Sequence, residues 1–229
     1  MVTIGLISEG ITDQIIIKRV IGGYLNDMDV SFTELQPRID PDNPEIAIDA
    51  GNWDQVFKYC QDSDFEEGLK ANPSLHIVIH LDSDVFRTKE VSEKYRFEFN
   101  RKDGTVLTTE EVISEIIALL ITEIGQEIYD KYTDRILFAI AVDETECWLL
   151  PFYETGKARS KEVNCLKALN RKISSKFSFT IHKKQPKYYF KVAKPLLKHK
   201  NFIKLYHHNT SLHIFCEQLD ELPKNNEEE

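Results

Sequence analysis

The chain has 229 residues, 41% of them hydrophobic, which is enough to bury a core in one large domain or in a domain with a small extension. No apolar run approaches the roughly 20 residues of a membrane-spanning helix, and the first residues lack the pattern of a secretory signal, so we expect a cytoplasmic protein without membrane contact. The four cysteines are widely spaced, which favours buried, reduced thiols over a disulfide framework or a structural zinc site.

The first part of the chain predicts a strand, a turn, a helix and a second strand. Residues 2–8 form a short apolar run with β-branched residues, and Glu9 lies in the turn that follows. Apolar residues at helical spacing after Thr12 predict a capped helix. Residues 31–39 alternate as a strand does, and the sequence DPDNP at 40–44 predicts a loop.

The middle of the chain continues this alternation. Residues 51–71 predict a helix, and 75–85 form a nearly continuous apolar run that ends in acids, as a buried central strand does. The pattern at 94–107 predicts a β-hairpin inserted after that strand. Residues 109–132 predict a long helix and 135–142 a second buried strand. Strands that alternate with helices predict an α/β sandwich with a mainly parallel central sheet.

The charge of the chain is divided unevenly. Residues 1–156 carry −18, residues 157–204 carry +14, and the last 25 residues carry −5, which together give the net charge of −9. After residue 157 the patterns are helical only. We therefore predict three parts: a domain of alternating strands and helices at 1–156, a helical basic extension at 157–222, and a disordered acidic tail at 223–229.

The basic extension is interleaved with aromatic residues, as in surfaces that bind phosphate. The alternative is a solvated helical face that neutralises the acidic part of the same molecule. We favour nucleic-acid binding, and the candidate contacts are Lys183, Lys184, Lys187, Lys191, Lys194 and Lys198.

Acids follow each of the three most apolar predicted strands. They are Glu9 after the first strand, Asp82 and Asp84 after the second, and Asp143, Glu144 and Glu146 after the third. Ligand sites in parallel sheets collect at the carboxyl ends of the strands. Asp82 and Asp84 face the same side while the backbone stays extended, so they could share a hard cation. A lone D-x-D is often only a loop with helix caps, but three acidic strand ends together favour a metal site.

Trp148 and a group of histidines could belong either to a functional site or only to the structure. Trp148 begins an apolar W-L-L run and is expected in the core rather than as a platform for base stacking. The set of His207, His208 and His213 is a weak candidate for zinc, and the pair His207-His208 is more typical of a loop between helices.

The motifs EGITD and HIVIHLDSD resemble the TOPRIM domain, the metal-binding module of topoisomerases, DnaG-type primases and OLD-family nucleases. The stretch AVDETECWLLPFY is similar to the E-x-E-x-W-L-L segment of RloB-like stand-alone TOPRIM proteins associated with phage defence. The match covers scattered motifs over residues 3–155, and Asp13 stands where Glu is common. The resemblance implies that residues 1–156 form a Rossmann-like TOPRIM sandwich, which would be a metal-binding catalytic domain.

The resemblance also implies roles for the acids. Asp82 and Asp84 would hold divalent metal, Glu144 or Glu146 would add ligands, and Glu9 would serve as a ligand or a general base. Two Mg²⁺ or Mn²⁺ ions would supply an activated water and neutralise the leaving oxygen. Lys191, or alternatively Lys194, would steady the charge that develops on the phosphate.

We therefore expect a divalent-metal-dependent nuclease that acts on DNA or RNA in prokaryotic anti-phage defence. The resemblance allows that an OLD-like or ABC-type ATPase encoded separately controls it, which would fit a chain with no nucleotide-binding motif of its own, and a homodimer is left open. One alternative is a non-catalytic module that binds nucleic acid or a partner on a TOPRIM-like scaffold. A nucleotidyl transferase such as a primase is a third reading, disfavoured by the short chain.

Overall fold

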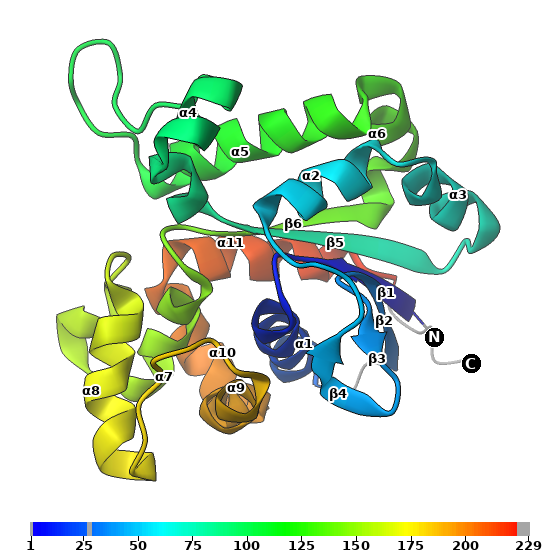
Figure 1. Cartoon of the computed structure of the whole chain (residues 1–229). Coiled ribbons are helices and arrows are strands. Elements are labelled where there is room, and N and C mark those ends of the chain that lie inside the picture. The colour runs from blue at the N-terminus through cyan, green and yellow to red at the C-terminus, as the bar shows by residue number, and fades with distance from the viewer. Residues whose placement is uncertain (1, 27–28, 224–229) are drawn as a thin grey trace.

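Four parallel strands form the central sheet of the computed structural model, which describes residues 2–26 and 29–223. The strand order is β2-β1-β5-β6, and every neighbouring pair is parallel. The strands are β1 (Val2–Ile7), β2 (Val30–Gln36), β5 (Leu75–Asp82) and β6 (Ile136–Ala141). All residues of β5 and β6 are buried, because helices cover both faces of the sheet (Figure 1). The prediction of a parallel α/β sandwich is confirmed.

One face of the sheet is covered by the helices of the middle of the chain (Figure 1). They are α2 (Trp53–Gln61), α3 (Ser63–Ala71), α4 (Lys89–Tyr95), α5 (Thr109–Ile124) and α6 (Gln126–Tyr132). The helix predicted at 51–71 is two helices, because the Asp62 side chain accepts a hydrogen bond from Asp64 N and caps a new start. The helix predicted at 109–132 breaks at Gly125, whose φ is 91°.

The other face is covered by the first helix together with the C-terminal helices (Figure 1). They are α1 (Ile11–Leu25), α7 (Leu150–Tyr153), α8 (Cys165–Phe177), α9 (Pro186–Val192), α10 (His199–Leu205) and α11 (Thr210–Gln218). Helix α11 packs on β6, and the C-terminal helices share one hydrophobic core with β1 and α1. The basic segment is thus helical as predicted. That it forms a part of the chain separate from residues 1–156 stays a prediction.

Trp148 lies in that core. It is fully buried, stacks on Phe215 with ring centroids 5.5 Å apart, and donates a 2.8 Å hydrogen bond from Nε1 to Ser211 Oγ. The prediction of a core tryptophan is confirmed, and its polar nitrogen is satisfied as burial requires.

Two loop regions differ from the sequence-based expectation. The segment 40–44 is part of a small antiparallel hairpin of β3 (Ile39–Asp40) and β4 (Asn43–Ala47) rather than a plain loop. The hairpin predicted at 94–107 contains a single antiparallel bridge, between Asn100 and Val106, because α4 continues to Tyr95. Residues 224–229 of the predicted tail lie outside the described part of the chain.

The cysteine prediction is wrong for one pair. Cys147 and Cys165 form a disulfide with Cα atoms 4.9 Å apart, whereas Cys60 and Cys216 are free and buried. The two bonded residues are 18 positions apart, and only the fold brings the segment after β6 against the start of α8. Within the described ranges, no helix has the length and apolar character needed to cross a membrane.

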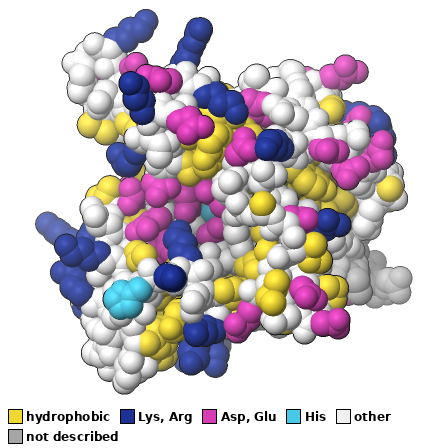
Figure 2. Space-filling model, viewed as in Figure 1, with side chains coloured by type: hydrophobic (Ala, Val, Ile, Leu, Met, Phe, Trp, Pro, Cys, Tyr) yellow, Lys and Arg dark blue, Asp and Glu magenta, His cyan; other side chains and the backbone are white. Residues whose placement is uncertain are grey.

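The topology creates a crevice at the carboxyl ends of β1 and β5. The chain leaves β1 through α1 on one face to reach β2, and it reaches β5 on the opposite side of β1 through α2 and α3 on the other face. Ligands bind at such switch points in open α/β sheets. Figure 2 shows Asp and Glu side chains gathered in a hollow, with Lys and Arg side chains at its margins.

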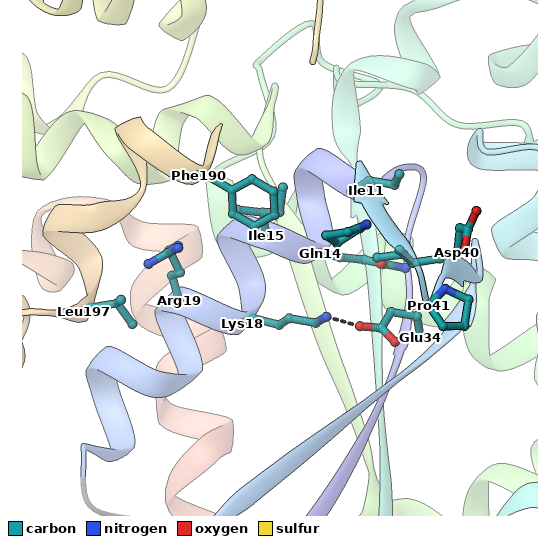
Figure 3. Close-up of a pocket in the computed structure, with 12 residues that line it drawn as sticks. Ile11, Gln14, Ile15, Lys18, Arg19, Glu34, Asp40, Pro41, Phe190 and Leu197 are labelled. Carbon is teal, nitrogen blue, oxygen red and sulfur yellow. Dashed lines mark hydrogen bonds and ion pairs between the residues drawn. The ribbon is translucent and has the colours of Figure 1, made fainter. Parts of the chain in front are cut away.

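Edge strand β2 is linked to α1 by an ion pair between Glu34 and Lys18 (Figure 3). Gln14 of α1 adds two hydrogen bonds from Nε2, to the carbonyl oxygens of Gln36 at 3.2 Å and Pro37 at 2.9 Å. These contacts fix α1, and with it the acids at its start, against the sheet.

Candidate functional site

The strand ends of β1 and β5 meet through Glu9 and Asp82. Asp82 is the last residue of β5, and its backbone N donates a 2.9 Å hydrogen bond to Glu9 Oε1. Gly51 packs closely on the turn that carries Glu9, since a Cβ atom there would lie 2.3 Å from the Glu9 carbonyl oxygen. The backbone thus holds the Glu9 carboxyl over the switch point.

Thr145 is the centre of a buried polar group beneath Glu9. Its Oγ1 lies 2.6 Å from Asp82 Oδ1 and 3.0 Å from His80 Nε2. It also lies 3.2 Å from Oδ1 of Asp13, which belongs to the first turn of α1. A hydroxyl has one proton to donate, so with Asp82 as its acceptor the contact with Asp13 needs a proton on Asp13.

The pKa values show at which pH these protons are present. The pKa of Asp13 is raised to about 6, first by burial, with the charge on Asp82 adding to the rise and His80 opposing it. Burial, then the charges of Asp82 and Asp13, raise the pKa of Glu9 to about 8. For Asp82, burial alone would raise the pKa, but His80 and Lys184 outweigh it and lower the value. Glu9 therefore retains a proton near neutral pH unless a cation joins the group, whereas Asp13 takes up its proton only in mildly acidic solution.

Glu146 faces the same group from the third strand end. It is fully buried in a 3₁₀ turn, Thr145–Leu149, and the Tyr189 hydroxyl donates to its Oε1. Lys184 Nζ lies 3.4 Å from Glu146 Oε2 and 3.6 Å from Asp82 Oδ2. Oε2 is buried and accepts no hydrogen bond within the described part of the chain. The Lys184 ammonium therefore stands between two carboxylates of different strand ends.

The environment of Lys184 stabilises its charge. Partial burial alone would lower its pKa, but the charges of Asp82 and Glu146 prevail and raise it above the ordinary value. The side chain keeps 43% of its surface exposed, so it reaches the acids from the solvent side. Removal of the ammonium would leave the acids without their nearest cation.

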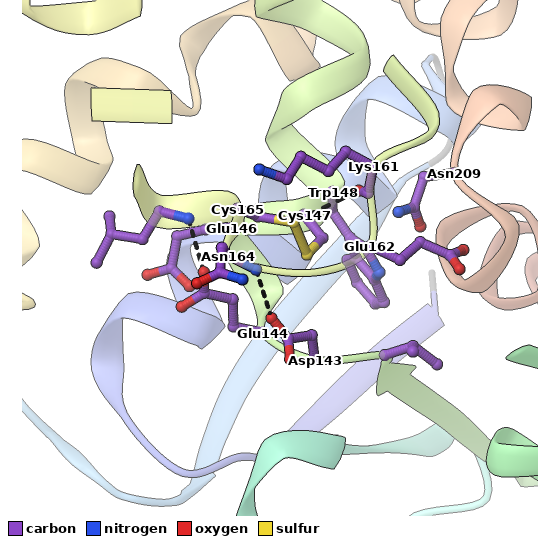
Figure 4. The surroundings of a disulfide bond; sticks show 12 residues. Asp143, Glu144, Glu146, Cys147, Trp148, Lys161, Glu162, Asn164, Cys165 and Asn209 are labelled. Carbon is purple, nitrogen blue, oxygen red and sulfur yellow. Dashed lines mark hydrogen bonds between the residues drawn. A yellow bond between two sulfur atoms is a disulfide. The ribbon is translucent and has the colours of Figure 1, made fainter. Parts of the chain in front are cut away.

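Glu144 and Asp143 are held away from this group by the start of α8. Leu166 N donates a 2.6 Å hydrogen bond to Glu144 Oε1, and Asn164 N donates a 2.9 Å bond to Asp143 Oδ2 (Figure 4). The pKa of Glu144 is raised to about 7, first by burial and then by the charge on Glu146. Of the two acids, Glu146 is the one that shares the Lys184 ammonium with Asp82, and which of them holds metal stays a prediction.

The disulfide lies at this junction. It joins Cys147, next to Glu146, to Cys165, the first residue of α8 (Figure 4). Together with the two backbone hydrogen bonds to Glu144 and Asp143, it attaches the acidic segment after β6 to a basic helix.

Asp84 does not continue the strand. A 3₁₀ turn, Ser83–Arg87, begins directly after Asp82, so the extended backbone that would place both carboxylates on one face is absent there. The Asp84 backbone N donates to Asp143 O at 3.0 Å, while its side chain is exposed. Shielding from water by its neighbours, and then the charge on Asp82, raise its pKa.

Among the predicted lysines, Lys184 is the one that contacts the acids. Lys191 lies elsewhere, with Nζ 5.7 Å from the centroid of the Phe179 ring, and Lys187 lies over Tyr188. Three other predicted lysines are exposed: Lys183, Lys194 and Lys198. Of the predicted lysines, Lys184 rather than Lys191 lies beside the acids at the strand ends, and the role expected of Lys191 stays a prediction.

The sequence analysis missed Thr145 and Tyr189 as members of the site. Threonine and tyrosine carry no signal of their own, and Tyr189 reaches Glu146 across 43 positions. Asp13 was noted only as a departure from a motif, although its place in the first turn of the helix after Glu9 could have suggested it.

A cavity of about 430 Å³ opens over Glu9, Asp13 and Asp82. Its wall also includes Asn52 and Lys184. No set of three His, Cys, Asp or Glu residues in the described ranges is arranged to hold a metal ion as it stands. The donors nonetheless suit a hard cation, because they are carboxylates and one buried oxygen, Glu146 Oε2, has no hydrogen bond.

Fold and geometry thus define an α/β protein with an acid-lined cavity at the switch point of a parallel sheet. In comparisons with known proteins, no family model, no curated protein and no solved structure matches the chain.

Proposed function

We propose that the chain is a divalent-metal-dependent nuclease that hydrolyses phosphodiester bonds of DNA or RNA. One observation carries the proposal: Glu9 and Asp82 line one cavity together with Lys184, and the Lys184 ammonium also lies 3.4 Å from the buried Glu146 of the third strand end. The resemblance of the EGITD and HIVIHLDSD motifs to TOPRIM domains supports it.

The acids have separate roles in this proposal. Mg²⁺ or Mn²⁺ supplies an activated water and neutralises the leaving oxygen when bound. Asp82 and Glu146 would hold the metal, and Glu9 would be a further ligand or the acceptor of a proton from water. The TOPRIM resemblance implies a second ion, and Asp84 and Glu144 would be its candidate ligands, although both turn away from the first group in the structure. Thr145 and His80 orient Asp82, to which both are bonded or close.

Lys184 takes the place that the sequence analysis gave to Lys191. In the structure its ammonium neutralises Asp82 and Glu146. With metal held by these acids, the partly exposed Lys184 ammonium would be free to turn to the phosphate and steady its developing charge.

Basic groups border the site on the side of α8. A surface hollow of about 600 Å³ contains Lys167 and Arg171 as well as Glu144. These side chains, with the six lysines of the basic extension, are suited to contact phosphates on either side of the scissile bond.

The biological setting rests on the TOPRIM resemblance. We propose a cytoplasmic effector of prokaryotic anti-phage defence, controlled by an OLD-like or ABC-type ATPase encoded separately, with homodimer formation open. The test is cleavage by the isolated chain with and without such a partner.

A second function is favoured by the position of Lys184. A lysine that neutralises the acids permanently would leave no room for metal, and the chain would be a non-catalytic module that binds nucleic acid or an acidic partner through its basic helices. Binding would then weaken steeply with salt, and no metal would induce turnover.

The deciding experiment follows cleavage of single-stranded and duplex DNA and RNA with Mg²⁺, Mn²⁺ or EDTA. We expect metal-dependent shortening by the wild type and its loss in Asp82→Asn and in Glu146→Gln. Glu98→Gln is the matched control, because Glu98 is an exposed acid remote from the cavity lining. Unchanged cleavage in both site variants would overturn the assignment of these acids, and metal-independent binding without cleavage would favour the binding module.

A further inference from the structure

A second cavity lies beside the acidic one. It measures about 530 Å³, which is within the range of ligand pockets. Its lining is mainly apolar and comes from α1, the β3–β4 hairpin, and the segment from α9 onward (Figure 3). The apolar side chains are those of Ile11, Ile15, Ile39, Pro41, Pro44, Phe190 and Leu197. The proposed chemistry at the acids uses none of them.

Arg19 brings to this cavity a positive charge that has no ion-pair partner among the described residues. The lining also contains one carboxylate outside the Lys18–Glu34 pair, that of Asp40, whose Oδ1 accepts a hydrogen bond from Asp42 N in its own hairpin. The other cation of the lining, Lys18, is paired with Glu34, whereas Arg19 has no ion pair or hydrogen bond from its side chain within residues 2–26 and 29–223 (Figure 3). Burial alone lowers the pKa of Arg19, and no neighbouring carboxylate offsets that cost. A half-buried guanidinium of this kind is suited to an anion such as a phosphate oxygen.

The lining also has an unused hydrogen-bond acceptor. Gln14 is fully buried, and both bonds from its Nε2 go to backbone carbonyls, while Oε1 has no partner in the described part of the chain. Phe190 supplies an aromatic ring on the α9 side of the same cavity (Figure 3). A flat ring with N–H donors would satisfy the amide and pack on the phenyl ring.

The two cavities are continuous in their walls. Ile11 lines both cavities. In the β3–β4 hairpin, Pro44 lines the second cavity and its neighbour Glu45 the acidic one; in α9, Phe190 lines the second cavity and Pro186 the acidic one. The cavities therefore follow one another along α1, from the acids at its start toward Arg19. Eight residues of helix separate Ile11 from Arg19, about 12 Å at 1.5 Å per residue, a distance that a few nucleotides of a strand span.

We propose that this second cavity is a subsite for one unpaired nucleotide of a single-stranded segment whose scissile phosphate lies over the acids. The base packs on Phe190 and bonds to Gln14, and a phosphate of the same strand binds Arg19. A base inside a duplex is stacked and paired and does not enter such a cavity, so the substrate is single-stranded or locally opened. The inference rests on the proposed nuclease function and narrows its substrate class.

The test measures binding in EDTA, so that it does not depend on cleavage. A labelled oligonucleotide of about 12 residues is titrated by fluorescence anisotropy, as single-stranded DNA, single-stranded RNA and the matching DNA duplex. We expect both single strands to bind more tightly than the duplex, and the two single-stranded arms distinguish deoxyribose from ribose.

Variants identify the cavity as the site. Phe190→Ala should weaken single-strand binding about tenfold, because stacking of a base on an aromatic ring contributes roughly 1–3 kcal/mol. Arg19→Gln should weaken it and reduce the slope of log K against log salt by about 0.7, the value for one phosphate contact on a single strand. The control is Arg96→Gln, an exposed arginine outside the cavity, which should change neither affinity nor preference for single strands.

Unaltered affinity and salt slope in Arg19→Gln would overturn the subsite, and so would equal binding of duplex and single strands by the wild type. Arg19 is half exposed, so this variant is expected to fold even where Phe190→Ala does not. The two proposals fail separately. If Asp82→Asn abolishes cleavage while Arg19→Gln binds as the wild type does, the subsite is wrong and the nuclease proposal stands. If binding depends on Arg19 but no metal-dependent cleavage occurs, the nuclease proposal is wrong and a nucleotide-binding site remains.

Discussion

The backbone amide of Asp82 donates a 2.9 Å hydrogen bond to Oε1 of Glu9, a residue 73 positions earlier in the chain. The bond joins the carboxyl ends of two neighbouring parallel strands, β1 and β5. It also brings two carboxyl groups close together, and burial with this proximity raises the pKa of Glu9 to about 8. The acids are therefore held in an arrangement that is unfavourable at high pH without a cation.

Glu9→Gln should stabilise the metal-free protein at alkaline pH. The folded pKa of Glu9 is raised from 4.5 to about 8, so the native state binds the proton more tightly than the unfolded state does, and stability falls as pH rises between these values. Glutamine retains an acceptor for Asp82 N but does not ionise. We expect little difference at pH 4 and a gain of roughly 1–3 kcal/mol in unfolding free energy at pH 9, measured by urea denaturation in EDTA.

Glu98→Gln serves as the control for this titration, since Glu98 is exposed. It should leave the pH dependence unchanged. A Glu9→Gln protein whose stability follows the wild type at every pH would show that the Glu9 carboxyl is not held in a proton-retaining environment.

Lys184→Met should destabilise the metal-free protein and strengthen the response to metal. The substitution removes the ammonium from between Asp82 and Glu146 and leaves their charges without it. Because Lys184 is 43% exposed, we expect a loss of only about 1–2 kcal/mol. Added Mn²⁺ should raise the melting temperature of the variant more than that of the wild type.

Lys183→Met changes the neighbouring exposed lysine and serves as the control. It should alter neither the stability of the metal-free protein nor the rise in melting temperature with Mn²⁺. If Mn²⁺ left the melting temperature of Lys184→Met unmoved, the lysine would be a permanent structural cation and the binding-module function would be preferred.

The sequence was sufficient to predict the parallel sheet and the acids at three strand ends, because apolar strands and the residues that follow them are local features. It could not predict that Asp84 turns out of the strand, since a 3₁₀ turn after Asp82 is set by packing. It could not choose between Glu144 and Glu146 either. That choice depends on α8, whose first turn binds Glu144 through Leu166 N.

Thr145→Val should weaken the buried polar group while it retains the shape of the side chain. The hydroxyl contacts Asp82, His80 and Asp13, so its loss leaves buried polar atoms with fewer partners. We expect a loss of about 1–3 kcal/mol in unfolding free energy and a marked loss of any metal-dependent cleavage. Thr145→Ser, which keeps the hydroxyl, should retain most of both, and equal behaviour of the two variants would contradict the role of the hydroxyl.

The disulfide should contribute to stability through a loop of moderate length. Cys147→Ala combined with Cys165→Ala removes the link between positions 18 apart, and we expect a loss of about 2–3 kcal/mol. Thiol titration of the denatured, unreduced wild type should find two reactive thiols, Cys60 and Cys216. Four reactive thiols would show that the pair is reduced in solution, as the sequence analysis had predicted.

The disulfide and the contacts of Thr145 could not be predicted from the sequence for the same reason. The widely spaced cysteines and the isolated Thr145 have no local pattern that marks them, and their partners lie 18 to 132 positions away. Lys184 is one of many basic residues in its segment. It differs from Lys191 only in the fold, which brings the residues just before α9 to Asp82 and leaves Lys191 beside the Phe179 ring.

The most direct test of the account is calorimetric titration of Mn²⁺ into the wild type, Asp82→Asn and Glu146→Gln, with Glu98→Gln as control. The account predicts saturable binding to the wild type and the control, and its loss in each site variant. Metal that binds all four proteins equally would contradict the assignment of Asp82 and Glu146 as ligands, and absence of binding in the wild type, with or without a single-stranded oligonucleotide, would contradict a metal-dependent nuclease.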